Sequence, residues 1–138
     1  MENKDLRVCI DTNVLIDLLR NIDYASDSFE KLESTNAELA TTAINSFELY
    51  YGAYKTQKKE KNIQSVKELL DRLNIIKSDM EVSEKAGEIA VKLEKKGQPI
   101  GFRDIIIGCA ALINDYTMFT RNIEHFKRIP YLKIMKVL

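Results

Sequence analysis

Two spacings of apolar residues alternate along this chain. A nearly continuous apolar run covers residues 6–10, which is typical of a central strand in a sheet that is covered on both faces. Further short strands are predicted at 38–41, 75–76 and 117–120. Between these strands, apolar residues return every three or four positions, which predicts amphipathic helices over about 14–19, 25–32, 43–54, 63–73 and 82–93. A last strand is expected at 132–137, at an edge of the sheet. Strands that alternate with helices predict an α/β fold, an α/β/α sandwich with a mainly parallel central sheet.

Three of the helices carry more specific signals. Residues 103–113 are apolar on nearly every side, so this helix should lie at the centre of the fold. The helix before it ends at Gly97 and Pro99, residue types that suit a helix C-terminus. The helix that Thr42 can cap has four apolar residues on one side, which we expect to face away from solvent: Ile44, Phe47, Tyr51 and Tyr54.

Length, charge and cysteine content narrow the class of protein. No repeat, low-complexity segment or linker divides the 138 residues, so we expect a single domain over 1–138. The 21 basic and 21 acidic residues cancel, which argues against a strongly basic nucleic-acid coat protein. Cys9 and Cys109 fall in a predicted buried strand and helix, which indicates free thiols. Neither a membrane span nor a signal peptide is evident, so we expect a cytoplasmic protein without membrane contact.

Four segments, far apart in the chain, set acidic or amide side chains in apolar surroundings. They contain Asp11, Glu48, Asp104 and Asn122. Asp11 and Asn122 each follow a predicted strand, so they should lie at the carboxyl edge of the sheet, where α/β proteins bind ligands. Ionised carboxylates are unfavourable in apolar surroundings unless they are paired or bind a metal. We therefore expect the fold to bring these side chains together into one site.

Each acid also has a purely structural interpretation. Asp11 can cap the helix that follows it, which is worth about 1 kcal/mol, and Asn13 can orient Asp11 or be that cap itself. Glu48 shares the apolar side of its helix, yet it could reach water at the edge of that side. Asp104 lies in the first turn of the central helix, where the helix dipole favours a carboxylate. The functional interpretation therefore depends on the acids acting as a group.

The chemistry of such a group favours a hard divalent cation. Three converging carboxylates would repel one another, and Mg²⁺ or Mn²⁺ removes that repulsion because both prefer carboxylate and water oxygens. An acidic site of this kind can activate water and stabilise charge on a phosphodiester. Because His125 is the single histidine, neither a zinc site nor a mechanism based on two histidines is expected, and we interpret His125 as structural.

The same segments, in this order, resemble the PIN domain, and specifically the VapC-like toxin ribonucleases of toxin–antitoxin pairs. The resemblance rests on IDTNVLIDLL at 10–19, FELYYGA at 47–53, PIGFRDIII at 99–107 and TRN at 120–122, followed by His125 and Phe126. Each segment is short, but together they extend over nearly the whole chain. The resemblance implies a PIN-like fold and a divalent-metal-dependent endoribonuclease.

By this resemblance, Asp11, Glu48 and Asp104 are the metal ligands, and the cofactor is Mg²⁺ or Mn²⁺. Asn122 stands where many PIN nucleases carry a fourth acid, and the amide implies a weaker site for a second ion. Thr120 would support the catalytic site by hydrogen bonding. The family also implies an RNA substrate, a homodimer and a small antitoxin whose tail blocks the active-site groove.

Candidate substrate contacts lie next to the predicted ligands. Arg103 and Arg121 could hold RNA phosphates, and Asn13 is a third candidate. Two other functions stay open: a PIN-like scaffold that binds RNA or protein without cleaving, and a PIN nuclease of RNA maturation. The motif at 11–13 is also similar to that of haloacid-dehalogenase-type phosphatases, but their general acid is replaced here by Asn13, which cannot donate a proton in that role.

Overall fold

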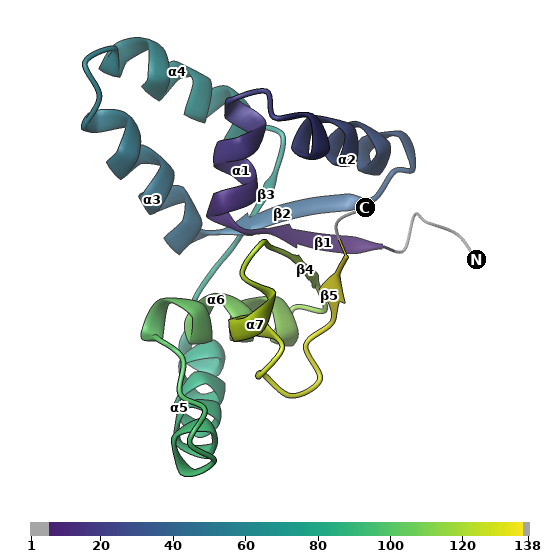
Figure 1. Cartoon of the computed structure of the whole chain (residues 1–138), viewed down its shortest axis with the longest axis vertical. Helices are drawn as coiled ribbons and strands as arrows, with labels where there is room; N and C mark the ends of the chain where they lie inside the picture. Colours follow the sequence, from purple (N-terminus) through teal and green to yellow (C-terminus); the bar gives the residue numbers. More distant parts are fainter. Residues whose placement is uncertain (1–5, 137–138) are drawn as a thin grey trace.

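Five parallel strands form the centre of the protein in the computed structural model, which describes residues 6–136 (Figure 1). They are β1 (Arg7–Ile10), β2 (Glu38–Thr42), β3 (Asn74–Ile76), β4 (Thr117–Phe119) and β5 (Ile134–Met135). Their order across the sheet is β3-β2-β1-β4-β5, so the first strand, β1, lies in the middle of the sheet. The order reverses at β1, which pairs with β2 on one side and β4 on the other. Ligand sites of open α/β sheets lie at such a point, beyond the carboxyl ends of the strands.

Helices cover both faces of the sheet (Figure 1). On one face lie α1 (Thr12–Leu19), α2 (Asp23–Ser34), α3 (Ala43–Tyr54) and α4 (Lys59–Leu70). On the other lie α5 (Met80–Lys95), α6 (Phe102–Ile113) and α7 (Ile123–Phe126). The predicted α/β/α sandwich with a parallel sheet is therefore confirmed.

The three inner strands, β1, β2 and β4, are largely buried on both sides, as expected for strands that are covered on both faces. In β1, Val8 and Ile10 belong to the core beneath α1 to α4, while Cys9 between them belongs to the core beneath α5 to α7. Cys9 and Cys109 are both buried and free, as expected. Burial raises the pKa of the Cys109 thiol to about 11, so this thiol stays neutral.

The central position predicted for α6 is confirmed. Its buried residues include Ile105, Ile107 and Cys109, all at most 3% exposed. Gly108 lies where α6 meets the segment after α7, and a Cβ atom added there would come within 2.3 Å of the Cδ1 atom of Ile129. The preceding helix ends as predicted, since Gly97 adopts a left-handed conformation with φ of +70° just beyond α5.

One helix face was predicted wrongly. Phe47, Tyr51 and Tyr54 are 64%, 56% and 60% exposed, whereas the buried side of α3 is formed by Asn45, Leu49 and Ala53. The helical spacing was correct, but α3 meets its neighbours α1 and α4 through a side that is less apolar in sequence. The prediction favoured the side with the three aromatic rings because the opposite side includes the polar residue Asn45.

Two element boundaries also differ from the prediction. The fourth helix ends at Leu70, and Leu73 is buried in the turn before β3. The last strand is reduced to Ile134–Met135 at the edge of the sheet, where it pairs with β4, and residue 137 lies outside the described residues. Within residues 6–136, no helix has both the length and the apolar character of a membrane span.

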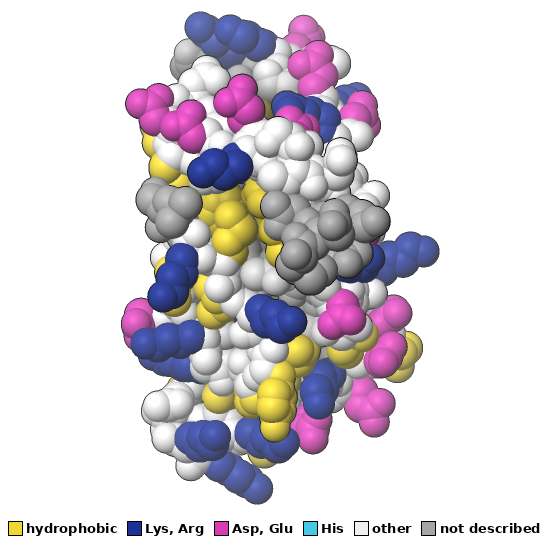
Figure 2. Space-filling view, turned by 90° about the vertical axis from the view of Figure 1, so that its right-hand side faces the viewer, with side chains coloured by type: hydrophobic (Ala, Val, Ile, Leu, Met, Phe, Trp, Pro, Cys, Tyr) yellow, Lys and Arg dark blue, Asp and Glu magenta, His cyan; other side chains and the backbone are white. Residues whose placement is uncertain are grey.

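Figure 2 shows the molecule from the side of the two termini, where β1 and β2 begin. Basic and acidic side chains are interspersed over this face, and neither sign forms a continuous surface. The polar residues singled out in the sequence lie at the other edge, at the carboxyl ends of the strands.

Candidate active site at the carboxyl edge of the sheet

Asp11 follows β1 directly and is 1% exposed. Its Oδ1 atom accepts hydrogen bonds from the backbone N–H of Thr12 at 2.9 Å and from Nδ2 of Asn45 at 3.0 Å. Its Oδ2 atom accepts from Oγ1 of Thr120 at 2.7 Å. Asp11 also stands at the N-cap of α1, so the structural and functional interpretations apply to the same residue. A buried carboxylate that accepts hydrogen bonds at both of its oxygens in this way is held in one orientation.

Asn45 is a part of this site that the sequence interpretation gave no role. Its side chain is fully buried, and its Oδ1 atom accepts from the backbone N–H of Thr42 at 3.1 Å in a capping box at the start of α3. Its Nδ2 atom donates to Asp11 and, at 2.8 Å, to Oγ1 of Thr12. One amide thus joins the N-termini of α1 and α3. The signal was present in the sequence, since an amide three residues after a capping threonine indicates this motif.

Glu48 enters the site from the second turn of α3, with 28% of its side chain exposed. Its Oε1 atom accepts from Oγ1 of Thr12 at 2.5 Å, and Arg103 donates to both of its carboxylate oxygens. Burial raises the pKa of Glu48, but the hydrogen bonds from Arg103 and Thr12 outweigh that effect and lower it below its usual value. Glu48 is therefore an ionised member of the site.

Asp104 reaches the site from the first turn of α6, with 9% of its side chain exposed. Its Oδ2 atom accepts from Nδ2 of Asn122 at 3.0 Å and lies 2.9 Å from Nδ1 of His125. The ring of His125, for which the sequence indicated a structural role, thus lies next to one of the candidate acids. Its place three residues after Asn122, one turn along α7, was the available signal.

Arg103 lies in the middle of the three acids. It donates from Nε to Oε2 of Glu48 at 2.6 Å, from Nη2 to Oδ1 of Asp11 at 2.9 Å, and from Nη1 to Oδ1 of Asp104. Burial lowers the pKa of its guanidinium, but hydrogen bonds and the negative charges of Glu48 and Asp11 raise it well above its usual value. The three carboxylates therefore converge on one permanent positive charge.

Thr120 and Asn122 connect the acids, as the sequence suggested. Oγ1 of Thr120 donates to Asp11 and accepts from the backbone N–H of Asn122 at 2.9 Å. Asn122 in turn donates to Asp104. A single short loop after β4 thus links two carboxylates that are 93 positions apart in the chain (104 minus 11).

The candidate substrate residues Asn13 and Arg121 lie beside the acids without contacting them. Oδ1 of Asn13 accepts from the backbone N–H of Arg121 at 3.3 Å. The guanidinium of Arg121 pairs with Asp17, with 3.1 Å between Nε and Oδ2, and Tyr24 donates to the same carboxylate oxygen. Burial and this hydrogen bond raise the pKa of Tyr24 to about 12, so it stays a donor. Asp17 and Tyr24, to which the sequence interpretation gave no role, hold Arg121 at the edge of the site with 56% of its side chain exposed.

The chemistry of these side chains fits a hard divalent cation. Carboxylate, hydroxyl and amide oxygens are the ligands that Mg²⁺ and Mn²⁺ prefer. Within residues 6–136, no three acidic, histidine or cysteine side chains stand in an arrangement that could hold a metal as they are. The position shared by Asp11, Glu48 and Asp104 holds the guanidinium of Arg103. The acids therefore converge on a cation, and their donor set is the one a divalent ion would use.

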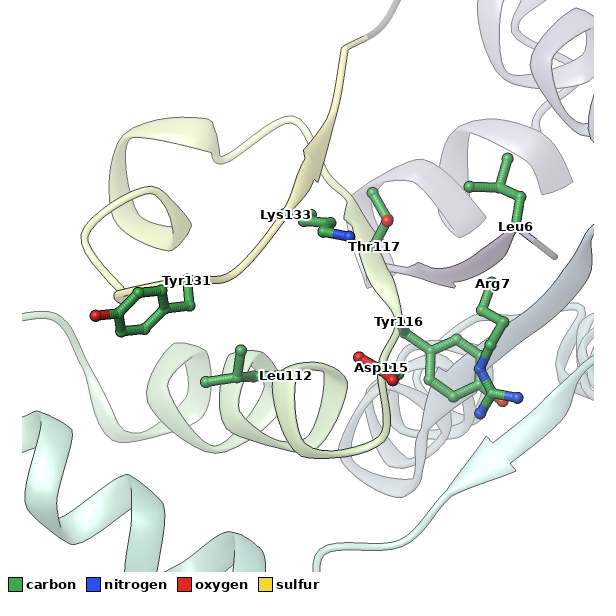
Figure 3. Close-up of a pocket in the computed structure, with 8 residues that line it drawn as sticks. All are labelled: Leu6, Arg7, Leu112, Asp115, Tyr116, Thr117, Tyr131 and Lys133. Carbon is green, nitrogen blue, oxygen red and sulfur yellow. The ribbon is translucent and has the colours of Figure 1, made fainter. Parts of the chain in front are cut away.

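A separate pocket lies at the opposite edge of the sheet, where β1 and β4 begin (Figure 3). Its Arg7 donates to Oε1 of Glu38 at 2.8 Å and to the carbonyl oxygen of Asn114 at 3.0 Å. The same guanidinium lies 4.3 Å from the ring centre of Tyr116. These contacts join β1, β2 and the end of α6, so we interpret this pocket as structural.

The acidic side chains gather where the strand order of the parallel sheet reverses. The PIN domain family model matches residues 8–131 of this chain. The chain belongs to the PIN domain family.

Within that family, the chain is similar to VapC ribonucleases. Ribonuclease VapC2 of Rickettsia felis is 36% identical over 124 residues, which cover 89% of this chain and 92% of that protein. The tRNA(fMet)-specific endonuclease VapC of Salmonella typhimurium is 29% identical over 129 residues, or 94% of this chain and 96% of that protein. The crystal structure of VapBC2 from Rickettsia felis bound to a promoter DNA fragment superposes with a TM-score of 0.85 at 33% identity, covering 94% of this chain and 98% of that one.

Proposed function

We propose that this protein is a Mg²⁺- or Mn²⁺-dependent endoribonuclease that hydrolyses RNA phosphodiester bonds, is the toxin of a VapBC-like toxin–antitoxin pair, and acts in the cytoplasm. One observation carries the proposal: carboxylates from three separate elements converge on a single cation at the carboxyl edge of the sheet. Relatives that bear the names Ribonuclease VapC2 and tRNA(fMet)-specific endonuclease VapC support the reaction class.

Asp11, Glu48 and Asp104 are the residues that would hold the ion. When bound there, a divalent ion would supply positive charge beside the scissile phosphate and make a nearby water molecule more acidic. These acids differ in exposure: Asp11 and Asp104 are nearly buried, whereas 28% of the Glu48 side chain is exposed. Glu48 is therefore the ligand with room to adjust to the ion.

The neighbouring residues keep these carboxylates in fixed orientations. Asn45 and Thr120 bind opposite oxygens of Asp11, and Asn122 and His125 bind one oxygen of Asp104. Donors of this kind align metal ligands in advance, and their loss typically lowers metal affinity or activity by about 10- to 100-fold. We assign Thr120 and Asn122 this supporting role in catalysis.

RNA would approach over Arg121 and Asn13. Asp17 and Tyr24 hold the Arg121 guanidinium at the rim, where it remains exposed and could contact a phosphate next to the one being cleaved. The backbone contact between Asn13 and Arg121 places the Asn13 side chain at the same rim. Arg103 could bind phosphate only after leaving the carboxylates that it contacts in this structure.

A groove beside Glu48 suits a partner segment. Helices α1, α3 and α4 line it with apolar side chains and a rim of polar ones, among them Ile16, Leu19, Leu49, Ala53, Val66, Arg20 and Asn62. Because Glu48 is among the residues that line this groove, a chain that occupied it would contact this acid. We propose that a small antitoxin places its tail here, and that the toxin itself is a homodimer.

Cleavage of structured RNA by the purified protein tests the proposal. We expect transfer RNA to be cut with Mg²⁺ or Mn²⁺ and left intact with EDTA. Replacing a proposed ligand, Asp11→Asn, should lower the cleavage rate by at least about 100-fold, since it alters a group that contacts the ion directly. Asp27→Asn is the matched control, because Asp27 is an exposed acid on α2, away from the site.

The possible outcomes separate the alternatives. Loss of cleavage in Asp11→Asn, but not in Asp27→Asn, supports a nuclease that uses this site. Equal cleavage by all three proteins points to a contaminating ribonuclease and rejects the site. An uncut panel of RNAs, together with RNA binding that does not respond to Asp11→Asn, favours a scaffold that binds without cleaving.

A further inference from the structure

All three guanidinium nitrogens of Arg103 donate hydrogen bonds to the acidic cluster, here defined as Asp11, Glu48 and Asp104. Nε and Nη2 donate to the two oxygens of Glu48 at 2.6 and 2.8 Å, a bidentate contact. Nη2 also donates to Asp11, and Nη1 to Asp104. In a surface ion pair a guanidinium contacts a single carboxylate, whereas the guanidinium of Arg103 contacts three.

The oxygens that Arg103 contacts are the ones directed toward the shared centre of the cluster. The remaining oxygen of Asp11 accepts from Thr120, and that of Asp104 accepts from Asn122 and His125. These second partners are neutral hydroxyl and amide donors or the imidazole, and they fix the outer side of each carboxylate. A cation at the position that the Arg103 guanidinium holds would meet the same oxygens of the three acids.

We propose that Arg103 is an internal competitor for the metal position: a divalent ion can bind the acidic cluster only when the Arg103 guanidinium moves out of it. This inference rests on the proposed metal-dependent function. According to this inference, Arg103 sets the affinity of the acidic cluster for the metal ion before RNA binds.

The charges explain why the two cations exclude each other. A divalent ion in contact with the same oxygens would stand a few ångströms from the guanidinium, and like charges at that distance repel strongly in a partly buried site. The three acids carry a charge of −3, which Arg103 reduces to −2. A divalent ion in its place leaves −1, so exchange improves neutralisation without placing two cations together.

The position of Arg103 in the fold permits this exchange. It lies in the first turn of α6, one residue after Phe102, whose side chain is 81% exposed, so the helix begins at the mouth of the site. Its own side chain is 36% exposed. Rotation of this long side chain can carry the guanidinium toward solvent while the backbone of α6, which is buried from Asp104 onward, stays in place.

Calorimetric titration with MgCl₂ in the absence of RNA provides the first measurement. We expect Arg103→Gln to bind Mg²⁺ about tenfold more tightly than the unchanged protein, as expected if release of the guanidinium is disfavoured by that factor. Arg121→Gln removes an equal charge beside the site, but Arg121 pairs with Asp17 and not with the cluster. Its Mg²⁺ affinity should therefore change by less than about twofold.

The side chain itself provides the second measurement. In ¹⁵N-labelled protein, the Nε–H resonance of Arg103, assigned by its absence in Arg103→Gln, reports the contact with Glu48. Titration with Mg²⁺ should shift it to the position of solvent-exposed arginines, whereas the resonance of Arg121 should stay. Thermal unfolding of Arg103→Gln in Mg²⁺ confirms that the variant is folded, and Arg103→Lys, which retains charge but cannot span three acids, should give an intermediate affinity.

The outcomes distinguish this inference from the proposed function. Equal Mg²⁺ affinities, or an Arg103 resonance that stays in place while Mg²⁺ binds, overturn the competition and leave the metal site standing. If neither the unchanged protein nor Arg103→Gln binds Mg²⁺ or Mn²⁺, the metal dependence of the proposed function fails together with the inference.

Discussion

At the scale of single residues, the buried amide of Asn45 holds the site together alongside its acids. Asn45 completes the cap of α3 and binds Asp11 and Thr12 from α1. An amide in this position bonds with its oxygen on one side and its nitrogen on the other. A buried group that loses such partners leaves unsatisfied donors and acceptors on both helices.

Replacement of this amide should lower stability. We expect Asn45→Ala to lower the free energy of unfolding by about 2 kcal/mol, because it removes a helix cap and leaves buried polar groups without partners. Asn74→Ala, at an exposed position whose amide bonds to Glu38, should change it by less than about 0.5 kcal/mol. Urea denaturation of both variants measures the difference. Equal effects would show that the Asn45 network contributes nothing beyond an exposed hydrogen bond.

Also at this scale, the sequence identified the acids but not the role of Arg103. Each acid stood out because its neighbours are apolar, a property visible within a few residues. Arg103 was noticed only as a cation next to Asp104. Its contacts with Asp11 and Glu48 join residues 92 and 55 positions apart, so they exist only once α3 and α6 meet at the end of β1.

At the scale of elements, α6 combines two tasks. Its first turn presents Arg103 and Asp104 to the site, and its middle packs Gly108 against Ile129. Since most residues of the helix from Asp104 to Ala111 are buried, a shift in their packing would also displace its first turn. The sequence predicted this helix well because it is apolar on nearly all sides, so no choice of face was needed. The face of α3 was mistaken because its aromatic residues are exposed.

Adding a methyl group at Gly108 is a test of how tightly α6 is packed. Gly108→Ala should lower the free energy of unfolding by about 1–3 kcal/mol, because the new Cβ would lie 2.3 Å from Ile129, which is itself buried and has little room to move. Gly87→Ala on α5 is the matched control: nothing lies within 4 Å of its added Cβ, so alanine should raise stability by roughly 0.5–1 kcal/mol. Thermal or urea unfolding gives both values. A neutral Gly108→Ala would mean that the close approach at Ile129 relaxes freely.

At the scale of the whole molecule, sheet order assembles the site. Ile10 of β1 pairs with Phe119 of β4. The residues that follow the two strands, Asp11 and Thr120, therefore lie side by side. Helices α3 and α6 then approach the same edge from opposite faces of the sheet, as Figure 1 shows.

The proposed toxin role makes a prediction for the protein as a whole. Expression of the unchanged protein alone should arrest bacterial growth, and co-expression of a small protein encoded next to it should relieve the arrest, because a tail in the groove would contact Glu48. Asp11→Asn should not arrest growth. Harmless expression of an active nuclease would contradict the toxin role, and sedimentation of the purified protein as a monomer would contradict the homodimer.

The sequence by itself determined the class of fold, the central strand and helix, and the acids of the candidate site, because burial of a strand or a carboxylate leaves a local pattern of neighbours. Only the tertiary structure decided which side of α3 is buried, that Asn45 and His125 belong to the site, and that Arg103 occupies its centre. These features depend on distances between elements that are remote in the chain. Such distances follow from strand order and helix packing, for which short stretches of sequence carry no signal.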